Sequence, residues 1–479
     1  MFYRARQAIL WGLSLALFLI YTGKYLVWDI QPMMQADSGG YLNYSAARTL
    51  GYPWFLSLVE FIFGSHKAVP WVQHAVFFLS LAYLTHQINR YLGLLSLAIL
   101  TLLGVGLQIE LIKYNFQIMS ESISVSILML MMGLIVQIYA TKFRLRPFLY
   151  FSFLVGLHLL IRPVHKLSAF VLVLMLFNFY ALKRINIKQA IWLVLPFLAW
   201  IGLGLAGQKY LHNVWQQEVF FGFNWIGKVS LIAKPGSKNT STYPEFDAAF
   251  IKNVEPVQLF LKEDNVRSFQ MRYLLSAVYY DYFRYLARPE LDPKPLAASG
   301  QSSDKVYGQL AFEYVKANPM AYVKDIGMNL TAVWLFLDLM TVKEKEELAQ
   351  FLKQQPLPYI EKWPYSLEVK AQNYLAIPLR VIFGALFLVT LYVSFAGGWL
   401  ILKGRFEKSA LSSLLFYASV FIQTHHLGIA VFQAGIPRYG FVMWPALVVA
   451  GACFLLKSYE VYQQNKQPSL KQAQEAYVI

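Results

Sequence analysis

Four ionisable side chains lie beside long apolar segments of the sequence and could act on a phosphate-bearing substrate. Asp37 and Glu121 are carboxylates, which can accept a proton, orient an acceptor or bind a metal ion. Arg162 and Arg438 carry planar guanidinium groups, which donate paired hydrogen bonds to phosphate. A charge costs at least ~2.5–3.5 kcal/mol at the centre of a membrane helix, and these four avoid such positions. The pattern indicates chemistry at a membrane surface.

Each of these residues also has a purely structural explanation. Asp37 can cap a short amphipathic helix over residues 38–50, with Tyr41 and Tyr44 resting on the membrane interface. Glu121 suits the first turn of a helix, where the helix dipole favours a carboxylate by about 0.3–1 kcal/mol. Long basic side chains can extend toward lipid headgroups. No single one of these residues therefore indicates a functional site. Such a site requires that their side chains lie together in the folded protein.

The two arginines have neighbours of matching chemistry. Arg162 shares a short hairpin with His165 and Lys166, in the sequence GLHLLIRPVHKLSAF. Short external loops usually avoid positive charge, so this group is better explained by an anionic ligand that it neutralises. The hairpin residues are thus candidate ligands of an anion such as phosphate, together with Arg438.

Aromatic and imidazole side chains accompany the late arginine. Tyr439 follows Arg438 directly, and His425 and His426 end the preceding apolar segment. With Tyr41, Tyr44 and Tyr52, these residues are candidates to line the substrate site. A divalent metal ion is left open, because no third ligand is spaced to complete a set with the two histidines.

The composition identifies the class of protein. Of 479 residues, 57% are hydrophobic and 14% charged, and the mean hydropathy is +0.44. A soluble domain carries about 25% charged residues, so soluble enzymes, nucleic-acid binders and secreted disulfide scaffolds are excluded. The net charge of +16 reflects basic cytoplasmic loops rather than a nucleic-acid partner. We expect an all-α polytopic membrane protein.

Ten apolar segments are long enough to predict transmembrane helices. They cover residues 8–28, 70–89, 92–109, 120–139, 147–161, 165–181, 189–207, 374–402, 409–430 and 437–457. Basic residues in three short loops, around positions 142–146, 183–188 and 403–408, place those loops in the cytoplasm. Both termini then lie in the cytoplasm as well, the first segment being read as a retained span rather than a signal peptide.

Two long segments fall outside the membrane in this arrangement. Residues 29–69 join the first two spans, and residues 208–373 form a soluble or cap region. Helices are predicted over 266–288 and 304–317, and residues 326–340 predict a re-entrant or interfacial helix, or an eleventh span. The expected organisation is a transmembrane module over 1–207, the cap, a second set of transmembrane helices over 374–457, and a cytoplasmic tail over 458–479.

Several short motifs resemble the GT-C superfamily of integral-membrane glycosyltransferases, in particular bacterial protein O-mannosyltransferases and the lipid A aminoarabinose transferase. They are Asp37 with Tyr41, the alanines at 46–47 and the GYP at 51–53; Glu121 in SES; the Arg162–Pro163 turn; Arg438–Tyr439; and VKANPMAYV, with Asn318, Pro319 and Tyr322. Asp37 is followed by Ser38, where the mannosyltransferase branch has a second acidic residue. No Walker, Rossmann, CxxC or GxSxG motif is present.

The resemblance implies an inverting glycosyltransferase in a bacterial inner membrane, with its active site on the periplasmic or extracellular side. The donor would be a sugar on a polyprenyl phosphate, and the acceptor a hydroxyl of a protein, of lipid A or of a polysaccharide. Asp37 would be the general base, and Glu121 would position the acceptor or a metal ion. Arg162 and Arg438, helped by Lys166 and His165, would stabilise the departing phosphate.

Two other functions remain open from the sequence. A polysaccharide polymerase or ligase would use the same lipid carrier but move an oligosaccharide. A lipid or solute transporter, such as a flippase, would show repeated halves and ionisable residues near the bilayer midplane, and neither is evident here. The identity of the sugar and of the acceptor cannot be read from these residues.

Overall fold

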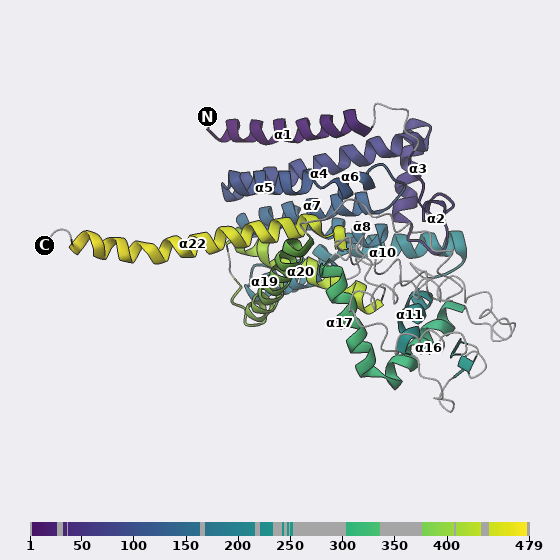
Figure 1. Cartoon of the computed structure of the whole chain (residues 1–479). Helices are drawn as coiled ribbons and strands as arrows, with labels where there is room; N and C mark the ends of the chain where they lie inside the picture. Colours follow the sequence, from purple (N-terminus) through teal and green to yellow (C-terminus); the bar gives the residue numbers. More distant parts are fainter. Residues whose placement is uncertain are drawn as a thin grey trace. The chain divides into compact units, whose positions relative to one another are not determined.

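The computed structural model describes residues 2–25, 32–35, 37–162, 168–215, 221–232, 242–243, 247–248, 250–251, 303–335, 376–406, 409–432 and 440–476. Within these ranges every named element is a helix (Figure 1). The first ten α-helices are α1 (Phe2–Tyr25), α2 (Ser38–Leu42), α3 (Gly51–Phe63), α4 (Val69–Leu92), α5 (Leu95–Gly106), α6 (Ile109–Tyr114), α7 (Glu121–Ala140), α8 (Leu145–Ile161), α9 (Ser168–Ala181) and α10 (Ile187–His212). They are followed by α11 (Phe221–Val229), α16 (Ser303–Ala317), α17 (Pro319–Leu335), α19 (Ala376–Leu402), α20 (Ala410–Phe432) and α22 (Trp444–Ala476).

Seven helical stretches of the described residues are long and apolar enough to cross a membrane. They are Arg4–Lys24, His66–Leu92, Glu121–Ala140, Ile187–His212, Val381–Leu402, Ala410–Phe432 and Trp444–Gln463. The other three predicted spans correspond to α5, α8 and α9, which have 12, 17 and 14 residues. At 1.5 Å per residue, α5 is only about 18 Å long and does not match a hydrocarbon core of about 30 Å. The all-α class is therefore confirmed, while the count of ten spans stays a prediction.

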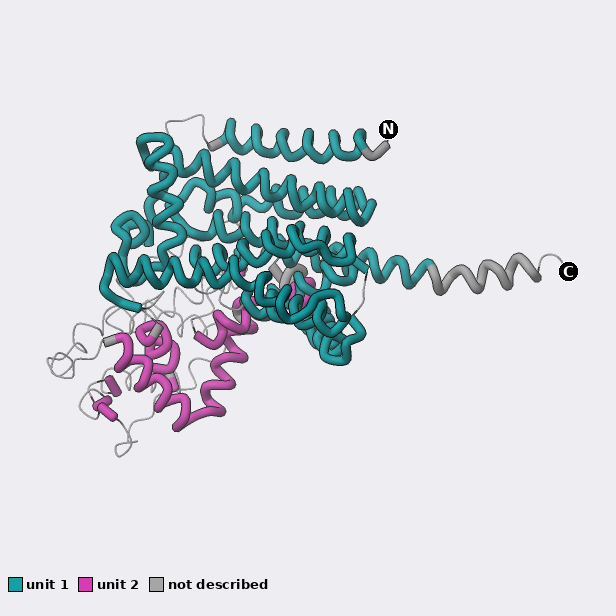
Figure 2. The backbone as a smooth tube through the Cα atoms, turned by 180° about the vertical axis from the view of Figure 1, so that it is seen from behind, with its two compact units in different colours: residues 1–217, 388–425, 441–479 teal, residues 218–387, 426–440 magenta. Residues whose placement is uncertain are grey.

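The chain divides into two compact units (Figure 2). Unit 1 contains Met1–Gln217, Leu388–His425 and Phe441–Ile479, and unit 2 contains Glu218–Phe387 and His426–Gly440. In unit 1, α4 packs on α7, α5 and α1, and α7 also packs on α8 and α22. Helix α7 is 78% buried and forms the core of this unit, whereas α10 is 11% buried and presents apolar residues outward. An apolar outer face of this kind is what a lipid environment requires.

Small residues explain why α7 can occupy the centre. A Cβ atom on Gly133 would lie 2.6 Å from the ring of Tyr83 on α4, so only glycine allows this approach. The serines of the first two turns are buried, and Ser126 Oγ donates to the carbonyl of Ser122 at 2.9 Å. The buried hydroxyl of Ser126 thereby finds its partner within α7, and that of Ser122 donates to Asn115 Oδ1 at 2.6 Å.

Unit 2 is built around the contact between α11 and α16. Asp304 Oδ1 accepts a hydrogen bond from the backbone N–H of Phe223 at 3.0 Å. Lys228 Nζ lies 2.8 Å from Asp325 Oδ2 on α17, and both side chains are buried. Burial lowers the pKa of Lys228, while the carboxylate of Asp325 opposes that shift. The two charges are therefore best regarded as one buried ion pair.

The predicted helices of the external segment have different outcomes. The helix expected over 304–317 is confirmed as α16. The helix expected over 266–288 lies outside the described residues. Of the predicted interfacial helix over 326–340, residues up to Leu335 belong to α17, and 336–340 lie outside the described part.

Candidate functional site

The surroundings of Asp37 differ from the capping role that its sequence position suggests. Helix α2 has five residues, Ser38–Leu42, so the helix predicted over 38–50 is wrong beyond Leu42. Asp37 makes no side-chain cap hydrogen bond. Its Oδ1 instead lies 2.6 Å from Nη2 of Arg48, and both side chains keep partial contact with solvent. Asp37 is thus a partly exposed carboxylate paired with a cation.

Glu121 and Arg162 form a second ion pair, which is more deeply buried. Glu121 begins α7 as predicted, and Arg162 follows the last residue of α8. Arg162 Nη1 lies 3.0 Å from Glu121 Oε1, with side-chain exposures of 11% and 1%. Two charges so far from water require each other, because a lone buried charge costs several kcal/mol.

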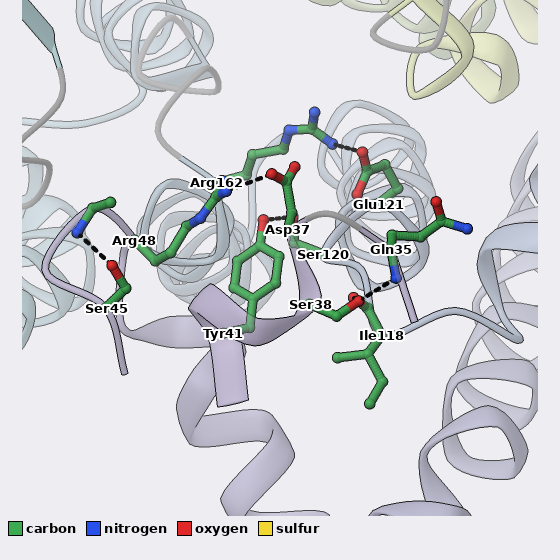
Figure 3. A network of polar contacts seen from close by, with 11 residues as sticks. Gln35, Asp37, Ser38, Tyr41, Ser45, Arg48, Ile118, Ser120, Glu121 and Arg162 are labelled. Carbon is green, nitrogen blue, oxygen red and sulfur yellow. Dashed lines mark hydrogen bonds and ion pairs between the residues drawn. The ribbon is translucent and has the colours of Figure 1, made fainter. Parts of the chain in front are cut away.

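Tyr41 lies among the side chains of both pairs (Figure 3). The Arg48 guanidinium carbon lies 5.0 Å from the centroid of the Tyr41 ring. Burial is the largest influence on the pKa of Tyr41 and raises it. Arg48 and Arg162 lower that pKa, whereas Glu121 and Asp37 raise it further. Four charged side chains from three separate segments of unit 1 therefore act on one buried hydroxyl.

Hydrogen bonds between the segments hold this arrangement. Tyr41 Oη is 3.0 Å from the Oγ atom of Ser120, which is the residue just before α7. Ser38 Oγ donates to the carbonyl of Ile118 at 2.9 Å and accepts from the backbone N–H of Gln35 at 2.7 Å. Next to these contacts, Met33 and Gln117 form an isolated parallel β-bridge. The segment that carries Asp37 is thereby attached to the segment that carries Glu121.

A close approach of α3 to the end of α8 positions Arg162. Thr49 Oγ1 donates to the carbonyl of Ile161 at 3.2 Å. A Cβ atom on Gly51 would lie 2.7 Å from the carbonyl oxygen of Leu160. The neighbouring atoms are backbone and cannot rotate away, so the glycine sets how closely the two segments pack.

Replacement of Gly51 by alanine is expected to disturb this contact. Overpacking against a fixed backbone costs about 1–3 kcal/mol, so Gly51→Ala should lower the thermal unfolding midpoint of the detergent-solubilised protein. Gly12→Ala on α1 is the matched control, because no atom lies within 4 Å of its Cβ position. A Gly51→Ala midpoint equal to that of Gly12→Ala would contradict the argument.

His158 lies in the last turn of α8, four residues before Arg162. Its Nε2 is 2.8 Å from Ser124 Oγ on α7, and its Nδ1 is 3.4 Å from Ser168 Oγ on α9. The carbonyl of His158 accepts the backbone N–H of Arg162 at 3.1 Å. One imidazole thus joins α7, α8 and α9 close in sequence to Arg162.

The predicted lining residues occupy several different positions. Tyr41 is buried rather than resting on a surface, and Tyr52 packs edge to face against it with ring centroids 4.9 Å apart. Tyr52 is fully buried, and its Oη donates to Gln73 Oε1 at 2.8 Å. This hydrogen bond fixes the ring that packs against Tyr41. Tyr44 Oη is 2.6 Å from Ser57 Oγ on α3.

The two predicted histidines are buried. His425 belongs to unit 1. His426 belongs to unit 2, where its ring centroid lies 4.8 Å from that of Trp334. Four other predicted site residues lie outside the described residues, namely His165, Lys166, Arg438 and Tyr439. Within the described ranges, no group of three His, Cys, Asp or Glu side chains could hold a metal ion.

Sequence reasoning missed Arg48, the closest partner of Asp37. Gln208 Nε2 on α10 donates to the carbonyl of Arg48 at 2.7 Å, so a distant helix fixes the loop that carries it. Arg48 could have been found as a positive charge in an external segment, the same signal that pointed to Arg162. Ser120 and His158 offered no such signal, because their roles depend on packing between helices.

Comparison with known proteins identifies no relative of this chain. No family model, curated protein or solved structure matches the chain. The function must therefore be argued from the site itself.

Proposed function

We propose that the chain is an inverting glycosyltransferase that moves a sugar from a polyprenyl-phosphate donor to an acceptor hydroxyl at the external face of a bacterial inner membrane. The observation that carries the proposal is the gathering of Asp37, Arg48, Glu121 and Arg162 around Tyr41. These residues supply a partly exposed carboxylate and two guanidinium groups at one end of apolar helices. That combination suits a substrate with a hydroxyl nucleophile and a lipid-borne phosphate.

Asp37 would act as general base. The acceptor oxygen attacks the anomeric carbon, its proton passes to the Asp37 carboxylate, and the bond from the anomeric carbon to the phosphate oxygen breaks. A base must lie within about 2.6–3.2 Å of the proton-bearing oxygen, and a partly exposed carboxylate could meet this requirement. Arg48 Nη2 lies 2.6 Å from Oδ1 of Asp37 and would keep this carboxylate ionised and in place. Direct displacement inverts the anomeric configuration.

The departing phosphate takes the electron pair of the broken bond and gains negative charge. A guanidinium group fixed in advance stabilises that charge without reorganising as it develops. Arg162 is fixed by Glu121 at 3.0 Å and by the end of α8. Glu121 would thus position Arg162, which is a more specific role than positioning the acceptor. Arg438, Lys166 and His165 are proposed to complete the phosphate site.

The proposal is tested by mass spectrometry of surface glycoconjugates from cells with and without the gene. The expected result is the loss of one sugar residue from a protein, from lipid A or from a polysaccharide, with the lipid-linked donor accumulating. Loss of a whole oligosaccharide would instead indicate a polymerase or ligase. An unchanged set of glycoconjugates, with lipid or solute movement lost in proteoliposomes, would overturn the proposal in favour of a transporter.

A further inference from the structure

A fully buried glutamine on α4 has its amide engaged on both sides. Gln73 lies in the second turn of that helix. Its Nε2 donates to the carbonyl of Gln117 at 2.8 Å and to that of Asn115 at 3.1 Å. Its Oε1 accepts the hydrogen bond from Tyr52. An amide nitrogen carries two hydrogens, so both donors of this side chain are used to bind main-chain oxygens.

The carbonyls that Gln73 binds belong to the segment of residues 115–120, which joins α6 to α7 and forms no helix. This segment connects the two carboxylates of the candidate site. Its Ile118 carbonyl accepts from Ser38, the residue after Asp37, and its last residue directly precedes Glu121 (Figure 3). A group that fixes the 115–120 segment therefore influences where both carboxylates lie.

The next residue of α4 contacts the same segment. His74 Nδ1 is 3.3 Å from Nδ2 of Asn115, and its Nε2 is 3.4 Å from the carbonyl oxygen of Phe18 on α1. The Asn115 Oδ1 atom accepts from Ser122 Oγ at 2.6 Å, and Ser122 follows Glu121 in the first turn of α7. Two adjacent side chains of α4 thus attach the 115–120 segment to the helix bundle.

A second buried glutamine on α4 shows that burial alone does not create such an attachment. Gln87 is 6% exposed, and within the described residues its Oε1 has no hydrogen-bond partner. Polar side chains in apolar helices often serve only to hold helices together. Gln73 differs from Gln87 because its partners are main-chain atoms of a non-helical segment. Such a segment lacks the regular hydrogen bonds of a helix, so it depends more on side chains to fix it.

We propose that Gln73 is a positioning residue for the transfer reaction. It does not touch the substrate, and it holds the 115–120 segment so that Asp37 stays at a fixed distance from the pair of Glu121 and Arg162. A displacement of about 1 Å caused by a distant substitution can cost about 10²-fold in rate. The expected effect on transfer rests on the proposed function, whereas the effect on the 115–120 segment does not.

The test is hydrogen–deuterium exchange of the full-length protein in detergent, read by mass spectrometry on a peptide that covers residues 115–120. Gln73→Met keeps the length of the side chain and removes both donors. Buried carbonyls that lose their donors should lower the protection of this peptide by about 5- to 150-fold. Tyr52→Phe leaves both donors in place, so its effect should be only about 2- to 10-fold. Sugar transfer in cells at equal expression should fall by about 10²-fold in Gln73→Met.

Gln87→Met is the matched control, because it makes the same replacement of a buried glutamine on the same helix. Its exchange over residues 115–120 and its sugar transfer should equal those of the wild type. Equal exchange of this peptide in Gln73→Met and Gln87→Met would overturn the proposal. Faster exchange in Gln73→Met with undiminished transfer would overturn it as well.

Failure of the proposed function would have a different signature. If the wild type itself transfers no sugar, the glycosyltransferase assignment is overturned, and the exchange experiment still decides whether Gln73 holds the 115–120 segment. If Gln73→Met does not fold, Tyr52→Phe must lower the protection of the peptide at least about twofold relative to Gln87→Met for the proposal to hold.

Discussion

Asp37→Asn is expected to abolish sugar transfer while the protein still folds. Asparagine has the size of aspartate and its amide oxygen can still accept the hydrogen bond from Arg48, but it cannot take a proton from the acceptor hydroxyl. General base catalysis contributes about 10²- to 10⁴-fold, so the transfer rate should fall by that factor. The measurement is the modified fraction of the acceptor in cells that carry either the wild-type gene or the variant at equal expression.

Glu60→Gln provides the matched control for this substitution. Glu60 lies on α3, soon after Asp37 in the sequence, and pairs with His66 at 3.4 Å with 54% of its side chain exposed. The same loss of one negative charge should therefore leave transfer unchanged. Full transfer by Asp37→Asn would remove Asp37 from the catalytic role, and the proposed mechanism with it.

The second large effect concerns the buried pair of Glu121 and Arg162. Removing one partner leaves the other charge buried and unpaired, which costs about 3–5 kcal/mol. Glu121→Gln and Arg162→Gln should each lower stability by about that amount. The double variant should be less destabilised than the two single effects added together, because no uncompensated charge remains. The measurement is a double-mutant cycle on thermal or denaturant unfolding in detergent.

The surface pair of Lys113 and Glu110 serves as the reference for this cycle. Those side chains are 35% and 49% exposed, and an exposed pair contributes only about 0.2–1 kcal/mol. Additive effects of the substitutions at Glu121 and Arg162 would show that the two residues are not coupled in the folded protein. Loss of sugar transfer in the double variant, despite restored stability, would be consistent with a separate role of Arg162 at the phosphate.

Much of the fold could be predicted from hydropathy because a membrane helix is defined by a local property, a long apolar run. The segments predicted over 120–139 and 409–430 correspond closely to α7 and α20. The short helices were less predictable. Residues 38–50 have a helical pattern, yet only Ser38–Leu42 form α2, and the turn that follows brings Arg48 Nη2 within 2.6 Å of Asp37 Oδ1.

The site was predictable where it depends on charges near a membrane and not where it depends on pairing. Asp37, Glu121 and Arg162 stood out because charged residues are rare among apolar segments. Their partners did not follow from the sequence. The prediction grouped Arg162 with a substrate phosphate, whereas the structure pairs it with Glu121, which is 41 positions earlier by their residue numbers. Contacts between residues so far apart in sequence depend on how the helices pack. A hydropathy pattern does not show which helices pack together.

The link between Met33 and Gln117 has a consequence for how the protein can vary. The backbone N–H of Met33 donates to the carbonyl of Phe116 at 2.9 Å, and that of Ile118 donates to the carbonyl of Met33 at 3.2 Å. These bonds use main-chain atoms that every residue type except proline supplies in full. Met33 is 43% exposed, so its side chain can be replaced by that of any residue except proline while the main-chain link between the two carboxylate-bearing segments is kept.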